Sequence, residues 1–324
     1  MVKTARVHEY GGPEVIRIDD LPSPVPPSGH VLVAVKAAGI NFFDTQLRSG
    51  LYRRFSLPIS LGLEGAGIVE GIGPDVADLA AGDQVCWIMS PGSCATRAVV
   101  PVAKTAKLPT ALDFDRAAAG IYQGMTAHYL ADSVFPLGNG HVCIVHSAAG
   151  GVGHLLSQIA KRRGATVIGT VSSEAKVPMA KAAGADHVVV YTKAKLADEA
   201  KRLTDGRGVD VVYDAVGLET YEASLASLRP RGLLVLYGEA SGLVPPIDVR
   251  SLLFQGSCTL TRVGLEHFIE TRSEFLRRAN DILHWLADGT LRVHVDQTFA
   301  LADIAAAHRA IESRSRVGKV LLRP

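Results

Sequence analysis

Residues 141–164 constrain the fold more than any other stretch of the chain. An apolar run of strand length, 141–146, is followed by a turn of small side chains, 147–153. The next apolar residues recur at helical spacing, and Gly164 is typical of a helix end. Glycines allow a backbone to approach an anion, and the first helical turn offers N–H groups at the positive end of the helix dipole. The stretch therefore predicts a strand, turn and helix that seat a pyrophosphate.

The turn departs from the GxGxxG pattern, because Ser147 stands where the first glycine would be, before Gly150 and Gly153. On its own the pattern also fits a tight turn without a ligand. The rest of the chain favours the nucleotide interpretation, since apolar runs alternate with helical patterns to form six strand-like segments. These runs span residues 141–146, 166–171, 187–191, 210–213, 233–237 and 258–262. We therefore expect an α/β fold with a Rossmann doubly wound parallel sheet.

The chain has 324 residues, which favours more than one domain. Up to about residue 119 the pattern is β-like and broken by Gly and Pro turns, with no helix of convincing length. This part predicts a small, irregular β-domain. After Gly264 we expect a long helix to about residue 287, a strand over 293–299, a helix over 302–313 and a final strand over 317–322.

Composition excludes several classes of function. The formal net charge is only +2 and aromatic residues make up 6% of the chain, which argues against a dedicated nucleic-acid surface. No leader pattern and no uncharged run long enough to span a bilayer is present, so no membrane segment is expected. The four cysteines form no CxxC pair and are expected to be buried thiols. These features predict a cytoplasmic protein.

Several motifs together resemble one family. The chain is similar to zinc-independent quinone oxidoreductases of the zeta-crystallin type, within the medium-chain dehydrogenase/reductase superfamily. The matching segments are residues 11–15, 39–44, 48–52, 62–67, 82–85, 146–153 and 210–217. The resemblance implies a GroES-like catalytic domain over 1–121, a Rossmann cofactor-binding domain over 122–264, and a return to the catalytic domain over 265–324.

The resemblance also bears on metal binding. Zinc-dependent relatives have a cysteine where this chain has Asn41, and a His-Glu pair where it has Leu63 and Glu64. They also carry a cluster of four cysteines that this sequence lacks. Asn and Leu cannot replace the ligands of a tetrahedral zinc site. We expect no metal, and therefore an acceptor that is already electrophilic.

The function implied is NADPH-dependent reduction of a quinone by hydride transfer. A 2-alkenal or enone reductase is the nearest alternative, because the same pocket would serve both acceptors. A non-catalytic NADPH-binding protein, crystallin-like or RNA-binding, is an alternative of a different class.

NADPH is expected to lie at the carboxyl ends of the Rossmann strands, in a cleft between the two domains. Enzymes that use NAD place an acidic residue about 20 residues beyond the glycine turn. This chain has Ser172, Ser173 and Lys176 there, which suit a 2′-phosphate, although a helix cap and a surface lysine are the plain alternatives. The resemblance adds Tyr191 and Arg314 on the phosphate side. The pyrophosphate seat and the later strand ends contribute Gly150, Gly151, Val152, Gly153, Val216, Gly217, Tyr237 and Gly238.

From the catalytic-domain side, the resemblance implies that the nicotinamide half meets Asn41, Phe42, Asp44, Thr126 and Tyr129. Asn41 is a catalytic candidate that would bond the ribose or the substrate carbonyl, or else form an Asx turn. Asp44 is expected to be a structural or ribose-side group, with a general base as the alternative. Tyr52, the second catalytic candidate, would orient a carbonyl oxygen or serve as a packing aromatic.

The chain departs from the family pattern at three places that bear on the substrate pocket: Cys94, Glu239 and the pair Val263-Gly264. His146 ends a strand near the expected ligand, but a histidine in such an apolar run is expected to be a hydrogen-bonded core residue. The strand-like segment 256–262 is expected at the edge of the Rossmann sheet. Because an exposed edge invites pairing with a second copy, we expect a homodimer.

Overall fold

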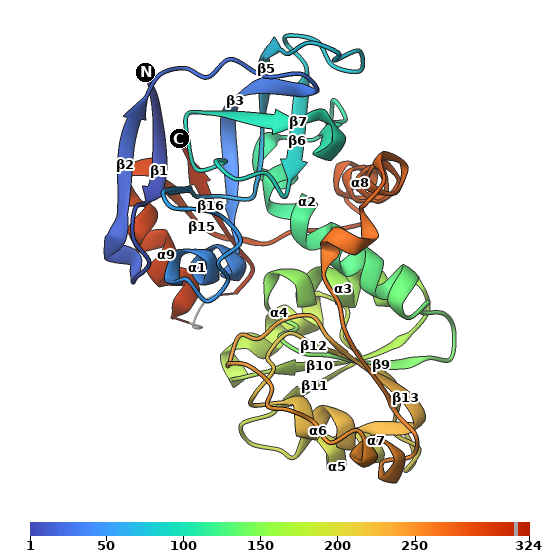
Figure 1. The fold of residues 1–324 in the computed structure, drawn as a ribbon. Coiled ribbons are helices and arrows are strands. Elements are labelled where there is room, and N and C mark those ends of the chain that lie inside the picture. The colour runs from blue at the N-terminus through green and yellow to red at the C-terminus, as the bar shows by residue number, and fades with distance from the viewer. Residues whose placement is uncertain (314–316) are drawn as a thin grey trace. The chain divides into compact units, whose positions relative to one another are not determined.

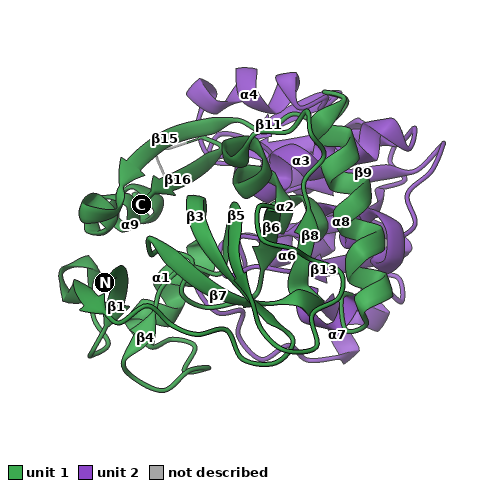
Figure 2. Cartoon of the chain, turned by 90° about the horizontal axis from the view of Figure 1, so that it is seen from above, with its two compact units in different colours: residues 1–125, 269–324 green, residues 126–268 purple. Residues whose placement is uncertain are grey.

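The computed structural model describes residues 1–313 and 317–324, which form two compact units (Figure 1, Figure 2). Unit 1 combines Met1–Met125 with Ile269–Pro324, and unit 2 is Thr126–Phe268. Among the described residues, no helix has the length and apolar character needed to cross a membrane.

Unit 2, whose residues are all described, is built on a six-stranded sheet in the order β11-β10-β9-β12-β13-β14. Every neighbouring pair is parallel, which confirms the doubly wound sheet that the alternating pattern predicted. The strands are β9 (Val142–Val145), β10 (Thr166–Val171), β11 (His187–Val190), β12 (Val209–Asp214), β13 (Leu228–Leu236) and β14 (Thr259–Arg262).

Helices cover both faces of this sheet. Figure 1 shows α3 and α4 on one face and α5, α6 and α7 on the other. Pro178 lies in the first turn of α4, where its missing N–H costs no helical hydrogen bond, so the helix starts late and is not broken. The helices are α3 (Gly151–Arg162), α4 (Val177–Ala182), α5 (Leu196–Arg202), α6 (Tyr221–Ala226) and α7 (Arg250–Phe254).

Unit 1 contains two sheets in its described residues. A three-stranded sheet has the order β2-β1-β4, and a seven-stranded sheet has the order β15-β16-β3-β5-β6-β8 with β7 also paired to β3. The strands are β1 (Val2–Val7), β2 (Ile16–Leu21), β3 (His30–Ile40), β4 (Ile59–Ser60), β5 (Glu64–Ile72), β6 (Gln84–Ile88), β7 (Arg97–Pro101), β8 (Thr105–Lys107), β15 (Val295–Ala300) and β16 (Lys319–Arg323).

Two predictions about helices were wrong. The first third of the chain does contain a helix, α1 (Phe42–Ser49), which ends at Gly50 with a φ of +80°. The long helix expected directly after Gly264 is divided into a short 3-10 turn, Leu265–Phe268, and α8 (Arg272–Ala287). Thr271 caps α8, and its hydroxyl accepts from the amide of Glu274 at 3.2 Å, so the chain must leave helical geometry just before it.

The C-terminal segment is part of the core of unit 1. Strand β16 pairs antiparallel with β3, and helix α9 (Ile304–Glu312) buries apolar side chains in the same cluster as the first strands. Helix α2 (Phe114–Tyr129) completes the set of longer helices.

Arg48 of α1 links α1 to α9. Its guanidinium donates to the Gly11 carbonyl at 3.0 Å, contacts His308 Nδ1 at 3.2 Å and pairs with Glu312. Burial, and then the charge of Arg48, lower the pKa of His308 to about 3, so the imidazole stays neutral and can accept. The end of the chain is therefore held in unit 1 by a sheet and by side chains.

β14 lies at the edge of the unit 2 sheet, as the sequence predicted. Just before it, α7 exposes Leu253 and Phe254, with 64% and 85% of their surface accessible. An open strand edge beside exposed apolar side chains favours association with another copy.

We therefore expect a homodimer, with a mass of twice 34.3 kDa by light scattering at micromolar concentration. Leu253→Asp combined with Phe254→Asp should shift the protein toward the monomer, because charge would be buried in the contact. Val25→Asp, at a valine that is 87% exposed in unit 1, is the matched control and should leave the mass unchanged. A monomeric wild-type mass would contradict the expectation.

Candidate functional site

The turn after β9 contains Ser147 and leads into α3. Although Ser147 is not a glycine, its φ is +53°, in the left-handed region that favours glycine. The amide of Gly150 donates to the Ser147 carbonyl at 2.7 Å and closes the turn. A Cβ atom on Gly153 would lie 2.3 Å from the same carbonyl oxygen. Glycine is therefore needed at 153 for the helix to pack this close to the turn.

The N-terminus of α3 is suited to an anion. Gly150 is the N-cap and has no side chain to occupy the first-turn N–H groups, which belong to Gly151, Val152 and Gly153. Lys161 and Arg162 lie in the last turn, where they complement the dipole of this 12-residue helix. The geometry fits the predicted pyrophosphate seat.

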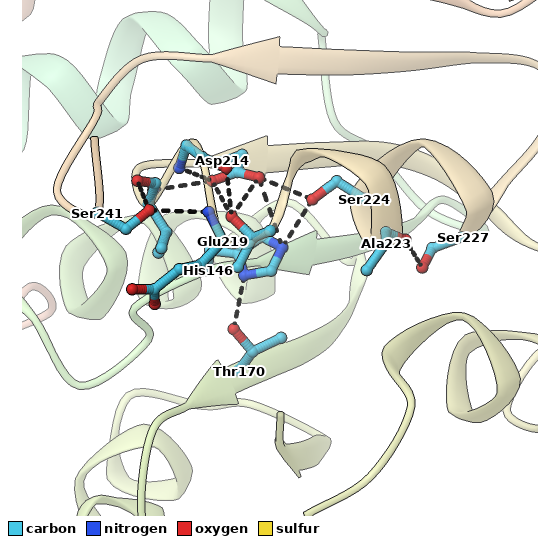
Figure 3. Close-up of polar contacts among 11 residues, drawn as sticks. His146, Thr170, Asp214, Glu219, Ala223, Ser224, Ser227 and Ser241 are labelled. Carbon is cyan, nitrogen blue, oxygen red and sulfur yellow. Dashed lines mark hydrogen bonds and ion pairs between the residues drawn. The ribbon is translucent and has the colours of Figure 1, made fainter. Parts of the chain in front are cut away.

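A buried polar network lies beside this turn, at the carboxyl ends of three neighbouring strands (Figure 3). His146 Nε2 is 2.9 Å from Ser224 Oγ, and Nδ1 is 2.9 Å from Thr170 Oγ1. The Ser224 hydroxyl donates to Asp214 Oδ2 at 2.7 Å, so it must accept from His146, which places the imidazole proton on Nε2. Burial lowers the pKa of His146, and the ring is neutral. His146 is thus a hydrogen-bonded core residue, as the sequence indicated.

Asp214, at the end of β12, shapes the loop that follows. Its carboxylate accepts from the amides of Val216 at 2.8 Å and Gly217 at 3.0 Å, and from the Thr220 hydroxyl. Gly217 has a φ of +86°, which a glycine adopts at no steric cost. The turn after β12 is therefore fixed by a buried charge that is fully supplied with donors.

The loop after β13 is joined to the loop after β12. The amides of Ala240 and Ser241 donate to the carbonyls of Ala215 and Val216 at 3.1 and 2.8 Å. A Cβ atom on Gly238 would lie 2.6 Å from the Ala215 carbonyl oxygen. The structure thereby brings the predicted cofactor-binding residues of these two loops together.

Tyr237, at the end of β13, carries an unusual hydroxyl. Its oxygen is buried and bonds to no protein group that the structure describes. Burial raises the pKa of this phenol, so it remains a donor. A buried hydroxyl without a partner is costly, and a polar ligand group would relieve that cost.

The predicted phosphate side lies after β10 and β11. The amide of Tyr191 donates to the Val171 carbonyl at 3.2 Å, so Tyr191 lies beside Ser172 and Ser173. Ser173 is the N-cap of the short 3-10 turn that contains Lys176. The structure therefore places four of the five predicted phosphate-side residues in one region: Ser172, Ser173, Lys176 and Tyr191. Arg314, the fifth, lies outside the described residues.

Thr126 and Tyr129 lie in the last turn of α2. The Tyr129 ring stacks on Phe268, with centroids 4.3 Å apart and planes 10° apart. A π-helical turn, Leu130–Val134, follows, and the Tyr213 hydroxyl donates to the Leu130 carbonyl at 3.2 Å. Such turns are frequent at functional sites.

The remaining predicted residues lie in unit 1, around the start of α1. The amide of Asn41 donates to Asp44 Oδ2 at 2.7 Å, so Asp44 closes the first turn of the helix. Phe42 packs against the apolar core of the unit. The Tyr52 ring packs against Phe43, with centroids 5.5 Å apart, which agrees with the packing alternative without deciding against a role in orienting substrate.

The carboxamide of Asn41 joins a buried polar group, defined here as the Asn41 cluster: Asn41, Glu64, Gln123 and Lys319. Asn41 Nδ2 donates to Glu64 Oε1 at 2.7 Å. Asn41 Oδ1 accepts from Lys319 Nζ at 2.8 Å and from Gln123 Nε2 at 3.3 Å. Lys319 and Glu64 also form an ion pair.

Asp44 is three residues from Asn41, and the charges of Lys319 and Glu64 act on its carboxyl group. Burial raises the pKa of its carboxyl to about 7, against the opposing effects of the Asn41 amide and the Lys319 charge. Its Oδ1 atom bonds to no described protein group. Asp44 is therefore a buried acid that titrates near neutral pH.

Packing accounts for Cys94 and ion pairing accounts for Glu239, which are two of the three departures from the family pattern. Burial raises the pKa of Cys94 well above its usual value, and the side chain is fully buried, so the thiol is unreactive. Glu239 is paired with Arg262 at 3.4 Å. Val263 continues the sheet pattern beyond β14, with its amide 3.2 Å from the Leu236 carbonyl.

Comparisons with known proteins agree with this geometry. The alcohol dehydrogenase GroES-like domain matches residues 27–137, and the zinc-binding dehydrogenase family matches residues 151–280. A quinone oxidoreductase of Salmonella typhimurium is 39% identical over the whole of both chains. The chain belongs to the quinone oxidoreductase family of the medium-chain dehydrogenase/reductase superfamily. This confirms the resemblance stated from the motifs, and the chain is an oxidoreductase of that family.

Two further relatives extend the comparison. The crystal structure of Escherichia coli quinone oxidoreductase complexed with NADPH superposes with a TM-score of 0.97 at 39% identity, covering 99% of this chain and all of that one. A 2-haloacrylate reductase of Burkholderia sp is 37% identical over all of this chain and 99% of its own. Quinone oxidoreductases are thus not its sole near relatives.

The resemblance implies that Asn41 and Leu63 stand at ligand positions of the zinc-dependent relatives, and the Leu63 side chain is buried. Among the residues described, no three His, Cys, Asp or Glu side chains gather as a metal-ligand set. The absence of a metal remains a prediction from the residue types at these positions.

Sequence reasoning missed three members of the Asn41 cluster: Glu64, Gln123 and Lys319. One signal was present, because Lys319 is a charged residue inside the apolar run 317–322, and buried lysines need a partner. The partner could not be named from the sequence, since Glu64 is 255 residues away.

Asp44→Asn tests the titration of Asp44. In the folded protein the pKa of Asp44 is about 7, above the usual 3.8, so the folded state binds the proton more tightly than the unfolded state. The free energy of unfolding should therefore decrease as pH rises from 3.8 to about 7, because ionisation of Asp44 favours the unfolded state. Asparagine keeps the acceptor for the Asn41 amide without the charge. Relative to wild type, the variant should gain about 2–3 kcal/mol between pH 5 and pH 8.

Thermal unfolding at several pH values measures this difference. Asp20→Asn, at an exposed aspartate of unit 1, is the control and should show no such trend. A difference between Asp44→Asn and wild type that does not change with pH would contradict the raised pKa.

Proposed function

We propose that this protein reduces quinones by hydride transfer from NADPH without a metal ion. The proposal is carried by the full-length similarity to quinone oxidoreductases together with the hydrogen-bonded polar cluster at Asn41. The hydride comes from the reduced nicotinamide of NADPH. The residues of this chain would bind, orient and shield the reactants.

Several features of unit 2 fit NADPH. The α3 N-terminus leaves its first-turn N–H groups without a side-chain cap, and the loops after β12 and β13 are fixed to each other. The Tyr237 hydroxyl is a buried polar atom that lacks a protein partner. Gly151, Val152 and Gly153 would hold the pyrophosphate, with Val216, Gly217, Tyr237 and Gly238 beyond it toward the nicotinamide.

Unit 1 would supply the residues that meet the acceptor. Asn41 presents a fixed carboxamide, and Tyr52 presents a phenol that would orient a carbonyl oxygen. Without a Lewis acid, the reaction depends on an electrophilic acceptor and on positioning. This favours quinones over alcohols or simple ketones.

A second candidate is reduction of an α,β-unsaturated carbonyl. It is favoured by the 37% identity to a 2-haloacrylate reductase over the full chain. Both acceptors accept hydride and place the resulting negative charge on oxygen, so the same residues would serve either. The two differ in the shape that the acceptor pocket must accommodate.

Steady-state assays with NADPH and a series of quinones and enones test the function. We expect the highest kcat/KM with a quinone and no loss of activity with a metal chelator. Tyr52→Phe should decrease kcat by less than about tenfold, because solvent can protonate a reduced quinone. Activity lost on chelation and restored by zinc would overturn the metal-free reaction. Tight NADPH binding without turnover of any acceptor would favour a non-catalytic NADPH-binding protein.

Cofactor preference tests the assignment of the phosphate side. Ser172, Ser173, Tyr191 and Lys176 are proposed to meet the 2′-phosphate, and the nearby Glu174 carboxylate is already paired with Lys193 at 3.1 Å. Lys176→Ala should reduce the preference for NADPH over NADH by about tenfold, equivalent to about 1.4 kcal/mol.

Calorimetric binding of NADPH and NADH gives the ratio directly. Lys181→Ala removes another lysine, exposed on α4, and should leave the ratio unchanged. Gly151→Val should abolish binding of both cofactors, since a side chain would fill the pyrophosphate seat. Equal affinity of the wild type for the two cofactors would remove the assignment.

A further inference from the structure

The Asn41 cluster contains a buried ion pair that the proposed reaction has not used so far. The side chains of Lys319 and Glu64 are 2% and 0% exposed. Lys319 Nζ donates to Glu64 Oε1 and to Asn41 Oδ1, while Glu64 Oε2 accepts from the amide of Tyr122 at 3.1 Å. Both charges are thus paired and hydrogen-bonded, the condition under which burial is tolerated.

Strand register brings the two charges together. β3 lies between β16 and β5, and Gly39 of β3 is opposite both Leu321 and Glu64. A Cβ atom on Gly39 would lie 2.4 Å from Glu64 Oε1 and 2.7 Å from Lys319 Cε. Glycine on the central strand therefore opens the space in which side chains from the two flanking strands meet.

The pair fixes one orientation of the Asn41 carboxamide. Its oxygen accepts from Lys319 and Gln123, which uses both lone pairs, so this atom must be the oxygen. Its nitrogen donates one hydrogen to Glu64 and carries a second N–H. An ammonium bonded to the oxygen of an amide draws electron density from it and makes its N–H a stronger donor.

The Lys319 ammonium of this ion pair has a counterpart in the zinc-dependent relatives. Asn41 and Leu63 stand where those proteins bind their catalytic metal, as the resemblance implied. In this chain the Lys319 ammonium lies one hydrogen bond behind Asn41. Burial of the ion pair keeps its field from being screened by water.

We propose that Lys319 is a positioning residue that makes Asn41 a polarised hydrogen-bond donor to the carbonyl oxygen of the acceptor. This rests on the proposed function. A C–H bond of the reduced nicotinamide would break and give its hydrogen and electron pair to carbon of the acceptor, so that NADPH becomes NADP⁺ and the π electrons of the acceptor move onto oxygen. The second N–H of Asn41 stabilises that negative charge until the oxygen takes a proton from water.

The test is a variant that removes both charges, Lys319→Met combined with Glu64→Gln. Methionine and glutamine are close in size to the residues they replace, and removing both partners leaves no unpaired buried charge. We expect melting temperature and NADPH affinity close to those of the wild type, but a decrease in kcat of about tenfold or more. Unchanged kcat in the folded, NADPH-binding variant would overturn the inference.

The choice of acceptor supplies a readout that a purely structural role would not alter. If Lys319 stabilises charge on the acceptor oxygen, the decrease in kcat should be larger for a weakly electrophilic enone than for 1,4-benzoquinone. An equal decrease for all acceptors would instead indicate a structural pair and overturn the inference. Should the methionine variant unfold, Lys319→Gln with Glu64→Gln is judged by the same two measurements.

A matched control separates this effect from any loss of an ion pair in unit 1. Arg323 on the same strand, β16, pairs with Asp115 at the surface. Arg323→Met with Asp115→Asn should leave kcat unchanged, and a decrease equal to that of the Lys319 variant would contradict a specific role. A wild type that reduces no acceptor would overturn the proposed function. An active wild type with an equally active Lys319 variant would overturn only the role of Lys319.

Discussion

Antiparallel pairing of β16 with β3 is the constraint on which unit 1 depends. It returns the last residues of the chain to the first long strand, so that Lys319 reaches Asn41 and Glu64. The same return places α9 beside α1, where Arg48 contacts His308. The polar residues around Asn41 are therefore assembled from distant parts of the chain, and all of them are buried.

In unit 2, several loops are held in place at the carboxyl ends of the parallel strands. Asp214 does this with a buried carboxylate that accepts from backbone amides and from hydroxyls, and His146 extends the network to β9 and β10. A fully satisfied buried network is rigid, because each member would lose a partner if the loops moved apart. Cofactor-binding loops are thus positioned by residues that need not touch the cofactor.

Local sequence signals identified the parallel sheet well because each of its units repeats the same pattern. The apolar run 166–171 coincides with β10, and the glycine turn leads into α3 as the spacing indicated. Helix α1 was missed because its eight residues carry few apolar side chains, and its best signals, Asn41 and Asp44 before Gly50, are also typical of a turn. The candidate site was predicted only in part, because local signals identify residues inside motifs. The roles of Glu64 and Lys319 were not predicted, because no local pattern links them to Asn41.

The family, the doubly wound sheet and the chemical character of the glycine turn could be predicted from the sequence, because they depend on periodicity and on short motifs. The pairing of the buried charges could not, because it depends on contacts between distant residues. Whether Lys319 is a surface cation or a buried neighbour of Asn41 depends on the register of β16 against β3, which brings Lys319 to Asn41 although the two are 278 positions apart. The raised pKa of Asp44 likewise follows from burial, which is a property of the packed protein and not of the residues around position 44 in the chain.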